Sequence, residues 1–179
     1  MSAVTEHLEQ RGSAVELLVH RQAGTATDEA RALGIDPAEV LKTLAVRTGP
    51  GSVLVVIPGP CRLDLRLVRE ALGDRQARLA SEEELARDFA GYQLGALPPL
   101  GALLGCVVYV DPEVLGHDLV VFAAGTRTES VRIRTRELFA SEQVTTVPLV
   151  KLADWGTDDL IRLRRAAHQE LAGGGYPGS

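Results

Sequence analysis

One lysine, Lys42, lies where a strongly signalled short helix runs directly into an apolar segment. Asp36 is suited to cap the start of that helix, and Pro37, with its fixed φ angle, is suited to its first position. From Thr43 onward the residues indicate the start of a strand. An ammonium group held at such a corner is positioned by the backbone, which suits recognition of a phosphate, a ribose or an ester carbonyl. The alternative is an ordinary surface lysine.

A second segment, residues 91–101, contains three glycines and two prolines. Pro98 and Pro99 remove two backbone donors and fix two φ angles, whereas the glycines allow conformations that are closed to other residues. The pattern predicts a stiff loop that presents free backbone N–H groups. Such groups can stabilise a developing oxyanion. The alternative is an ordinary connecting loop.

Lys42 and this loop belong to a longer ordered set of segments that runs over roughly residues 5–140. The set comprises Val15–His20, Thr27–Ile35, Val40–Leu44, Ser52–Pro58, Leu63–Leu65, Glu82–Leu85, the loop Gly91–Gly101 and Val121–Gly125. In this order the segments resemble the YbaK-like family. These proteins are freestanding aminoacyl-tRNA editing domains related to the insertion domain of bacterial prolyl-tRNA synthetase.

The resemblance implies catalytic roles for Lys42 and for part of the loop. Lys42 matches the family's functional lysine, which is expected to position the acylated 3′ end of tRNA. The loop residues whose backbone would polarise the ester carbonyl are Gly95, Ala96, Leu97, Pro98 and Pro99. The family's mechanism implies attack by a water molecule, helped by the free ribose hydroxyl of the substrate. It therefore implies no protein nucleophile, no metal and no other cofactor.

The resemblance also implies a set of substrate-binding residues. His20 ends a predicted strand where relatives often place a tyrosine, and its imidazole can hydrogen-bond the aminoacyl group; the alternative is a histidine that caps the strand end. Gly125 matches the family's glycine after a late strand, and Ser130 stands where some relatives carry an acid. The other expected substrate-binding residues are Thr25, Thr43, Gly101, Ala123 and Ala124. A small, fairly apolar pocket of this kind would suit a small amino acid such as alanine.

Composition limits the class of protein. A chain of 179 residues that is 45% hydrophobic is long enough for one domain with a real core. No segment resembles a signal peptide, and apolar runs such as Val53–Ile57 are too short to span a bilayer, so we expect a cytoplasmic protein with no membrane partner. Cys61 and Cys106 lack metal-ligand spacing, and we expect both to be reduced thiols.

The net charge of −5 opposes binding to RNA, so the distribution of the cations matters. Two rows of arginines are candidates: Arg62, Arg66 and Arg69 at helical spacing, and Arg132, Arg134 and Arg136 alternating along a predicted strand. The alternating row would share one face of the sheet. Either row can follow an RNA backbone, and the alternative for each is a solvated face with local ion pairs.

The order of predicted elements is mixed and is not a regular βαβ repeat. Helices are expected over 4–10, 26–33, 37–40, 64–72, 81–89 and 135–140, and strands over 15–20, 43–48, 53–57, 107–110, 119–123 and 131–134. This order predicts an α+β (mixed α/β) domain built around one curved, mostly antiparallel mixed sheet flanked by helices. The fold that the resemblance implies is the same.

We expect three regions. An editing domain covers residues 1–145, a C-terminal extension with a helix over about 157–171 covers 146–172, and a disordered tail covers 173–179. We expect the extension to pack on the same domain; docking of a second subunit and contact with tRNA are the alternatives. The sequence does not indicate an oligomeric state.

The expected function is trans-editing: hydrolysis of the ester of a mischarged tRNA, with tRNA(Pro) carrying a small wrong amino acid as the favoured substrate. The expected partners are aminoacyl-tRNA and, in addition, an aminoacyl-tRNA synthetase. Two alternatives remain open. One is a non-catalytic tRNA- or synthetase-binding module with the same fold, and the other is a hydrolase or binder of a different small acyl compound.

Overall fold

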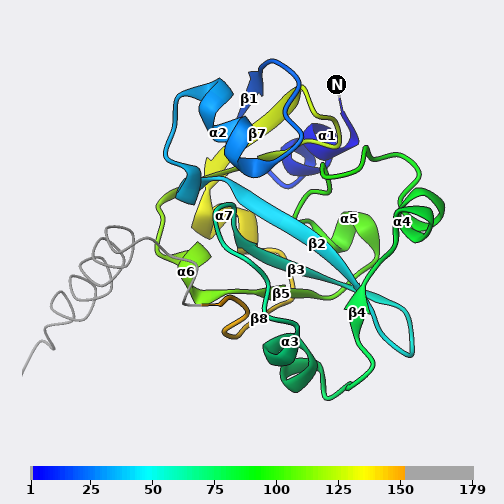
Figure 1. The fold of residues 1–179 in the computed structure, drawn as a ribbon. Coiled ribbons are helices and arrows are strands. Elements are labelled where there is room, and N and C mark those ends of the chain that lie inside the picture. Colours follow the sequence, from blue (N-terminus) through cyan, green and yellow to red (C-terminus); the bar gives the residue numbers. More distant parts are fainter. Residues whose placement is uncertain (1, 152–179) are drawn as a thin grey trace, which may run out of the picture.

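The computed structural model describes residues 2–151, and the strands of this part of the chain form two sheets (Figure 1). The smaller sheet is antiparallel, in the order β1-β7-β6. Its strands are β1 (Val15–Val19), β6 (Leu119–Ala123) and β7 (Glu129–Arg134). The larger sheet has the order β4-β2-β3-β5-β8. Its strands are β2 (Leu41–Arg47), β3 (Ser52–Pro58), β4 (Arg78–Leu79), β5 (Val108–Val110) and β8 (Val144–Thr146).

The larger sheet combines antiparallel and parallel pairs. β2 and β3 form a hairpin in which Arg47 lies opposite Ser52 and Lys42 lies opposite Ile57. β5 pairs with β3 in parallel, and β8 pairs with β5 in parallel. The expected class, a mixed α/β domain with a mostly antiparallel mixed sheet flanked by helices, is confirmed.

The expectation of one sheet is wrong, because β1 pairs with the late strand β7 and not with β2. The two sheets are joined by a parallel bridge between Val40 and Val121. Local patterns identify the segments that form strands, but pairing between strands far apart in the sequence is decided by tertiary packing.

Short helices connect and cover the sheets. They are α1 (Ala3–Gln10), α2 (Ala26–Leu33), the 3₁₀ turn η1 (Pro37–Glu39), α3 (Leu65–Leu72), α4 (Glu82–Asp88), α5 (Gly101–Leu104), α6 (Pro112–Leu115) and α7 (Thr135–Phe139). The predicted starts of α3 and α4 are confirmed, because the Asp64 side chain accepts from the Arg66 N–H and Ser81 forms a capping box with Glu84. The sequence did not predict β4, α5 or α6, which are only two to four residues long.

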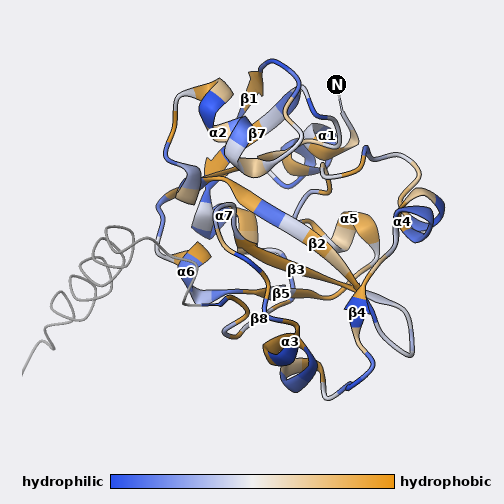
Figure 2. Ribbon diagram, in the orientation of Figure 1, coloured by the Kyte–Doolittle hydropathy of each residue, from blue (hydrophilic) through white to orange (hydrophobic). Residues whose placement is uncertain are grey.

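β2 and β3 are covered on both faces and separate two apolar clusters. Alternate residues such as Leu41 and Ala45 face the cluster that includes α1, and Val46 faces the cluster that includes Val68 of α3. In Figure 2 β3 is largely hydrophobic, β2 is hydrophobic at both ends with a hydrophilic band between them, and α4 is strongly hydrophilic. A smaller cluster of Ala30, Val40 and Val121 fixes α2 against the junction of the two sheets.

The ordered sheet continues across residue 145, the boundary expected for the editing domain. β8 pairs with β5, and Leu149 and Val150 are buried in the same cluster as Val68. The helix expected over 157–171 and the tail over 173–179 lie outside the described residues. In residues 2–151, no helix is long and apolar enough to cross a membrane.

Candidate functional site

A pocket of about 370 Å³ lies where α2, the start of β2, the turn after β3 and the glycine- and proline-rich loop meet. It brings together six of the residues expected at the site: Thr25, Lys42, Thr43, Gly95, Leu97 and Ala123. Other residues that line it are Gly24, Ala26, Thr27, Glu29, Leu41, Leu44, Gly59, Pro60, Cys61 and Arg62. We call this cavity the Lys42 pocket.

Lys42 is the second residue of β2, so its backbone is held by the β2–β3 hairpin. The side chain is half-buried, and this burial is the main reason that the pKa of Lys42 is lowered. Cys61 opposes the lowering of the pKa, and the charge of Arg62 adds to it. In the described part of the chain, Lys42 forms no ion pair with a carboxylate. Its ammonium group is therefore available to a ligand oxygen.

In the loop beside Lys42, two residues that line the pocket have a backbone donor without an acceptor among the described residues. The Ala96 N–H donates to Gln93 O at 3.0 Å, whereas the N–H groups of Gly95 and Leu97 have no acceptor within residues 2–151. Both Gly95 and Leu97 line the Lys42 pocket. Gly95 has a φ of +81°, and a Cβ there would lie 3.4 Å from Gly24 O, so the position favours glycine.

The other loop residues expected at the site hold the loop in position. Ala96, Pro98 and Pro99 are buried and do not line the Lys42 pocket. Ala96 O accepts from the Gly125 N–H at 3.1 Å, and the Gln93 N–H donates to Gly125 O at 2.9 Å. Gly125 therefore holds the loop in place through the backbone, at a φ of +93°.

Two further residues expected at the site do not line the pocket. Gly101 begins α5, where a Cβ would overlap Cys106 O, so close packing accounts for this glycine. Ala124 is buried in the core behind Ala123.

His20 and Ser130 contact each other and reach the pocket through a third side chain. The distance between His20 Nε2 and Ser130 Oγ is 2.8 Å, and the Ser130 hydroxyl donates to Glu29 Oε1. Glu29 is buried and lines the Lys42 pocket. Burial raises the pKa of Glu29, against the hydrogen bond from Ser130 and the charge of His20.

Sequence reasoning missed Glu29. A glutamate in the first turn of a helix is usually solvated, and its neighbour Asp28 does pair with Arg31 at 3.3 Å. The helical spacing contains a usable signal, because Glu29 lies three residues after Ala26 and four before Leu33, both of which pack in the cluster under α2.

Two other polar groups complete the lining. The hydroxyl of Thr43 is buried and has no hydrogen-bond partner within the described residues. Arg62 is exposed at the rim and makes no ion pair in residues 2–151, which places a second free cation close to Lys42. No group of three or more His, Cys, Asp or Glu side chains in this part of the chain is placed to bind a metal.

In the first arginine row, local contacts occupy the side chains of Arg66 and Arg69. Arg66 pairs with Glu70 at 3.1 Å and with Asp64 at 3.7 Å, and Arg69 donates to Ala77 O at 2.9 Å. Ion pairing of this kind is what a solvated face would show.

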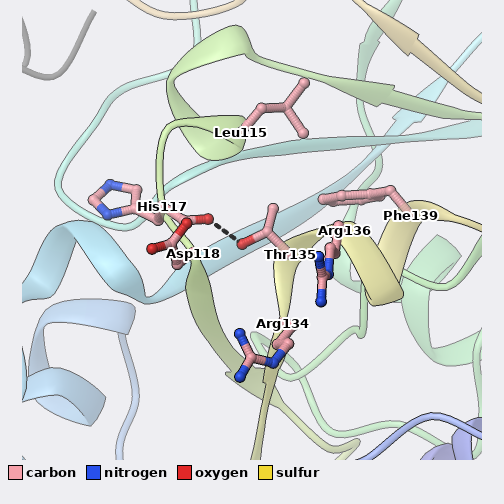
Figure 3. Close-up of a pocket in the computed structure, with 7 residues that line it drawn as sticks. All are labelled: Leu115, His117, Asp118, Arg134, Thr135, Arg136 and Phe139. Carbon is pink, nitrogen blue, oxygen red and sulfur yellow. Dashed lines mark hydrogen bonds between the residues drawn. The ribbon is translucent and has the colours of Figure 1, made fainter. Parts of the chain in front are cut away.

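The second row does not lie on one strand, so that expectation is wrong. β7 ends at Arg134 and α7 begins at Thr135, which places Arg136 on the helix, while Arg132 pairs with Glu16 at 3.4 Å. Arg134 and Arg136 line a separate hollow of about 360 Å³, with His117 and Asp118 from the segment before β6 (Figure 3).

Comparisons with known proteins identify the family of this chain. The family model of the aminoacyl-tRNA editing domain matches residues 20–140. EbsC of Enterococcus faecalis, a candidate Cys-tRNA(Pro)/Cys-tRNA(Cys) deacylase, is 29% identical over 112 residues, which are 61% of this chain and 66% of that protein. The proline–tRNA ligase of Thermosipho melanesiensis is 32% identical over 85 residues, which are 47% of this chain but 15% of the ligase. The chain therefore spans about two thirds of EbsC and a small part of the ligase.

Solved structures share the fold. A crystal structure described as that of a candidate trans-editing enzyme for prolyl-tRNA synthetase has a TM-score of 0.72 and 29% identity, covering 83% of this chain and 94% of that one. The hypothetical protein APE2540 has a TM-score of 0.75 and 29% identity, covering 83% of this chain and 99% of that one.

Proposed function

Because the chain belongs to the aminoacyl-tRNA editing domain family, we propose that it is a deacylase that acts in trans on mischarged tRNA. The favoured substrate is tRNA(Pro) that carries a small wrong amino acid. The cytoplasm, where tRNA is charged, is the compartment that goes with this function.

One observation carries the proposal: Lys42, Gly95 and Leu97 line the same pocket, and within residues 2–151 the Lys42 ammonium group forms no ion pair and the two backbone N–H groups have no acceptor. Lys42 would bind an oxygen of the acylated 3′ end, and Gly95 and Leu97 would donate to the carbonyl oxygen as it becomes an oxyanion. A water oxygen attacks the carbonyl carbon, the bond to the ribose oxygen breaks, and the proton from water passes to that ribose oxygen. The products are the free amino acid and uncharged tRNA.

The size of the pocket favours a small amino acid. A volume of about 370 Å³ lies at the lower end of the range for ligand pockets, and part of it must hold the terminal ribose. Ala123 supplies a wall without a hydroxyl group. Alanine, serine and cysteine are the amino acids to test, and cysteine is included because EbsC is named for cysteinyl-tRNA.

The proposal is tested by incubating the protein with tRNA(Pro) charged with alanine, serine, cysteine or proline. Acid gels then separate charged from free tRNA. We expect faster deacylation of at least one of the three mischarged tRNAs than occurs without protein, and little action on prolyl-tRNA(Pro). Binding of these tRNAs without any deacylation would favour the alternative, a non-catalytic tRNA- or synthetase-binding module.

A further inference from the structure

Glu29 is a carboxylate on the wall of the Lys42 pocket for which the proposed hydrolysis has no use. Its exposed fraction is only 6%, and it projects from α2, whereas Lys42 comes from β2. An ionised carboxylate is costly to bury unless a hydrogen bond or a cation compensates for the lost water. The contacts of Glu29 therefore show whether the protein itself compensates the charge of this carboxylate.

Within the described residues Glu29 has one side-chain partner, the Ser130 hydroxyl, which donates to Oε1. The nearby charged groups are His20 beyond Ser130, and Lys42 and Arg62 in the same pocket. No cation in residues 2–151 forms an ion pair with Glu29. Arg31, a cation on the same helix, pairs with Asp28.

The second carboxylate oxygen is open to a ligand. Oε2 accepts no hydrogen bond within the described residues. It is also not one of the side-chain oxygens that are completely buried without a partner, so some of its surface reaches solvent. Oε2 is therefore not fully buried, and Glu29 is one of the residues that line the Lys42 pocket. The hydrogen bond from Ser130 to Oε1 holds the carboxylate in one orientation.

Two kinds of donor are thus present in the Lys42 pocket for an oxygen ligand, and one anionic acceptor is present for a cation. The end of an aminoacyl-tRNA offers an ester carbonyl, a phosphate and one cation, the α-ammonium group. This group is mostly protonated at neutral pH, because α-amino groups titrate near pH 8. A charge-assisted bond between ammonium and carboxylate is stronger than one between neutral groups.

We propose that Glu29 Oε2 binds the α-ammonium group of the aminoacyl ester, so that the substrates are esters with a free, protonated α-amino group. This inference rests on the proposed deacylase function. Glu29 is then a specificity-determining residue, and esters of α-hydroxy acids, which lack the cation, are poor substrates.

The test compares alanyl-tRNA(Pro) with lactyl-tRNA(Pro), which nitrous acid produces from it by replacing the amino group with a hydroxyl group. If the panel above selects serine, the pair becomes seryl- and glyceryl-tRNA(Pro). The wild type should hydrolyse the aminoacyl ester about 10- to 100-fold faster, the range expected for one hydrogen bond to a charged group. Each enzymatic rate is divided by the spontaneous rate of the same ester, because the α-ammonium group also activates the ester. In Glu29→Gln the normalised aminoacyl rate should fall to the normalised hydroxyacyl rate, and the hydroxyacyl rate should stay near that of the wild type.

Glu29→Gln retains an oxygen that can accept from Ser130, so the fold should be preserved. Asp28→Asn is the matched control, because it removes one negative charge from the same turn of α2 at a residue that does not line the pocket. Asp28→Asn should keep the wild-type preference for the aminoacyl ester.

The outcomes separate this inference from the proposed function. If Glu29→Gln lowers both rates equally or changes neither, or if the wild type does not prefer the aminoacyl ester, ammonium binding by Glu29 is overturned and the deacylase remains. If the wild type hydrolyses none of these esters, the deacylase is overturned together with this inference.

Discussion

At the scale of single residues, Lys42 is a half-buried cation that the described fold leaves without a carboxylate partner. Lys42→Ala should lower deacylation at least about 100-fold, within the range found when a stabilising donor is lost. The melting temperature should change little, because no ion pair within residues 2–151 is broken. Arg66→Ala, which removes a cation that is paired on α3, is the control and should deacylate normally. A wild-type rate for Lys42→Ala would make Lys42 a surface lysine.

Gly95 allows a sharper test, because another glycine in the chain has nearly the same backbone strain. Gly95→Ala adds a Cβ at a φ of +81° beside the pocket, and displacement of its N–H should cost about 10²- to 10³-fold in turnover. Gly105→Ala carries similar strain at a φ of +68°, with nothing within 4 Å of the new Cβ. We expect similar losses of melting temperature from the two variants and a loss of turnover from Gly95→Ala alone. Equal turnover in both variants would remove the loop from catalysis.

Some residues of the Lys42 pocket could be singled out from the sequence, whereas others are at the pocket because of tertiary packing. Lys42 stands out in the sequence because it lies where a signalled helix start runs into a strand, and Gly95 because it lies in a loop rich in glycine and proline; their roles came from the resemblance to the editing-domain family. The use of the Ala96 N–H by Gln93 O depends on the conformation of the loop. The burial of Glu29 depends on how α2 meets the two sheets. Neither of these can be deduced from the order of residues alone.

At the scale of elements, local signals predicted the structure well wherever the signal and the structure lie within a few residues. The predicted bounds of α2 and its end at Gly34, which has a φ of +68°, are confirmed. The pairing of β1 with β7 was not predicted, because more than a hundred residues separate the two strands in the sequence. The hydrogen bond that Glu29 accepts depends on this pairing, since β7 carries Ser130.

The capping box of α4 allows a prediction of pH dependence. Hydrogen bonds from Arg78 and from the Ser81 N–H lower the pKa of Glu84 to about 2. A carboxylate with a pKa depressed on folding stabilises the protein above its unfolded pKa, near 4.5, and this contribution is lost as the pH falls toward 2. Glu84→Gln should therefore melt below the wild type at pH 7, with a smaller difference at pH 3.

Glu83→Gln is the matched control for that measurement, because it makes the same change of charge in the first turn of α4 outside the capping box. It should melt close to the wild type at both pH values. A Glu84→Gln difference that is independent of pH would show that the ionised carboxylate is not the stabilising form.

At the scale of the whole molecule, an acidic protein must bind tRNA through a few well-placed cations. Arg62 lines the Lys42 pocket and forms no ion pair with any residue of the described segment 2–151, whereas Arg66 is neutralised by Asp64 and Glu70. Arg62→Gln should weaken tRNA binding and reduce the slope of log affinity against log salt by about 0.7, as for one contact to a single strand. Arg66→Gln should leave the slope unchanged.

The hollow that Arg134 and Arg136 line is a second basic surface at which tRNA binding can be tested (Figure 3). If the double replacement of these arginines by glutamine lowers the salt slope and Arg62→Gln does not, the tRNA body lies on that surface. The 3′ end would then still have to reach the Lys42 pocket.

We propose that the Lys42 pocket hydrolyses the ester of a mischarged tRNA. The most direct measurement is the single-turnover deacylation rate on alanyl-, seryl-, cysteinyl- and prolyl-tRNA(Pro), for the wild type and for Lys42→Ala. We expect rapid loss of at least one mischarged ester with the wild type, spontaneous rates with Lys42→Ala, and intact prolyl-tRNA(Pro), as hydrolysis in this pocket requires. Spontaneous rates on all four esters with the wild type, or equal rates for the wild type and Lys42→Ala, would contradict it.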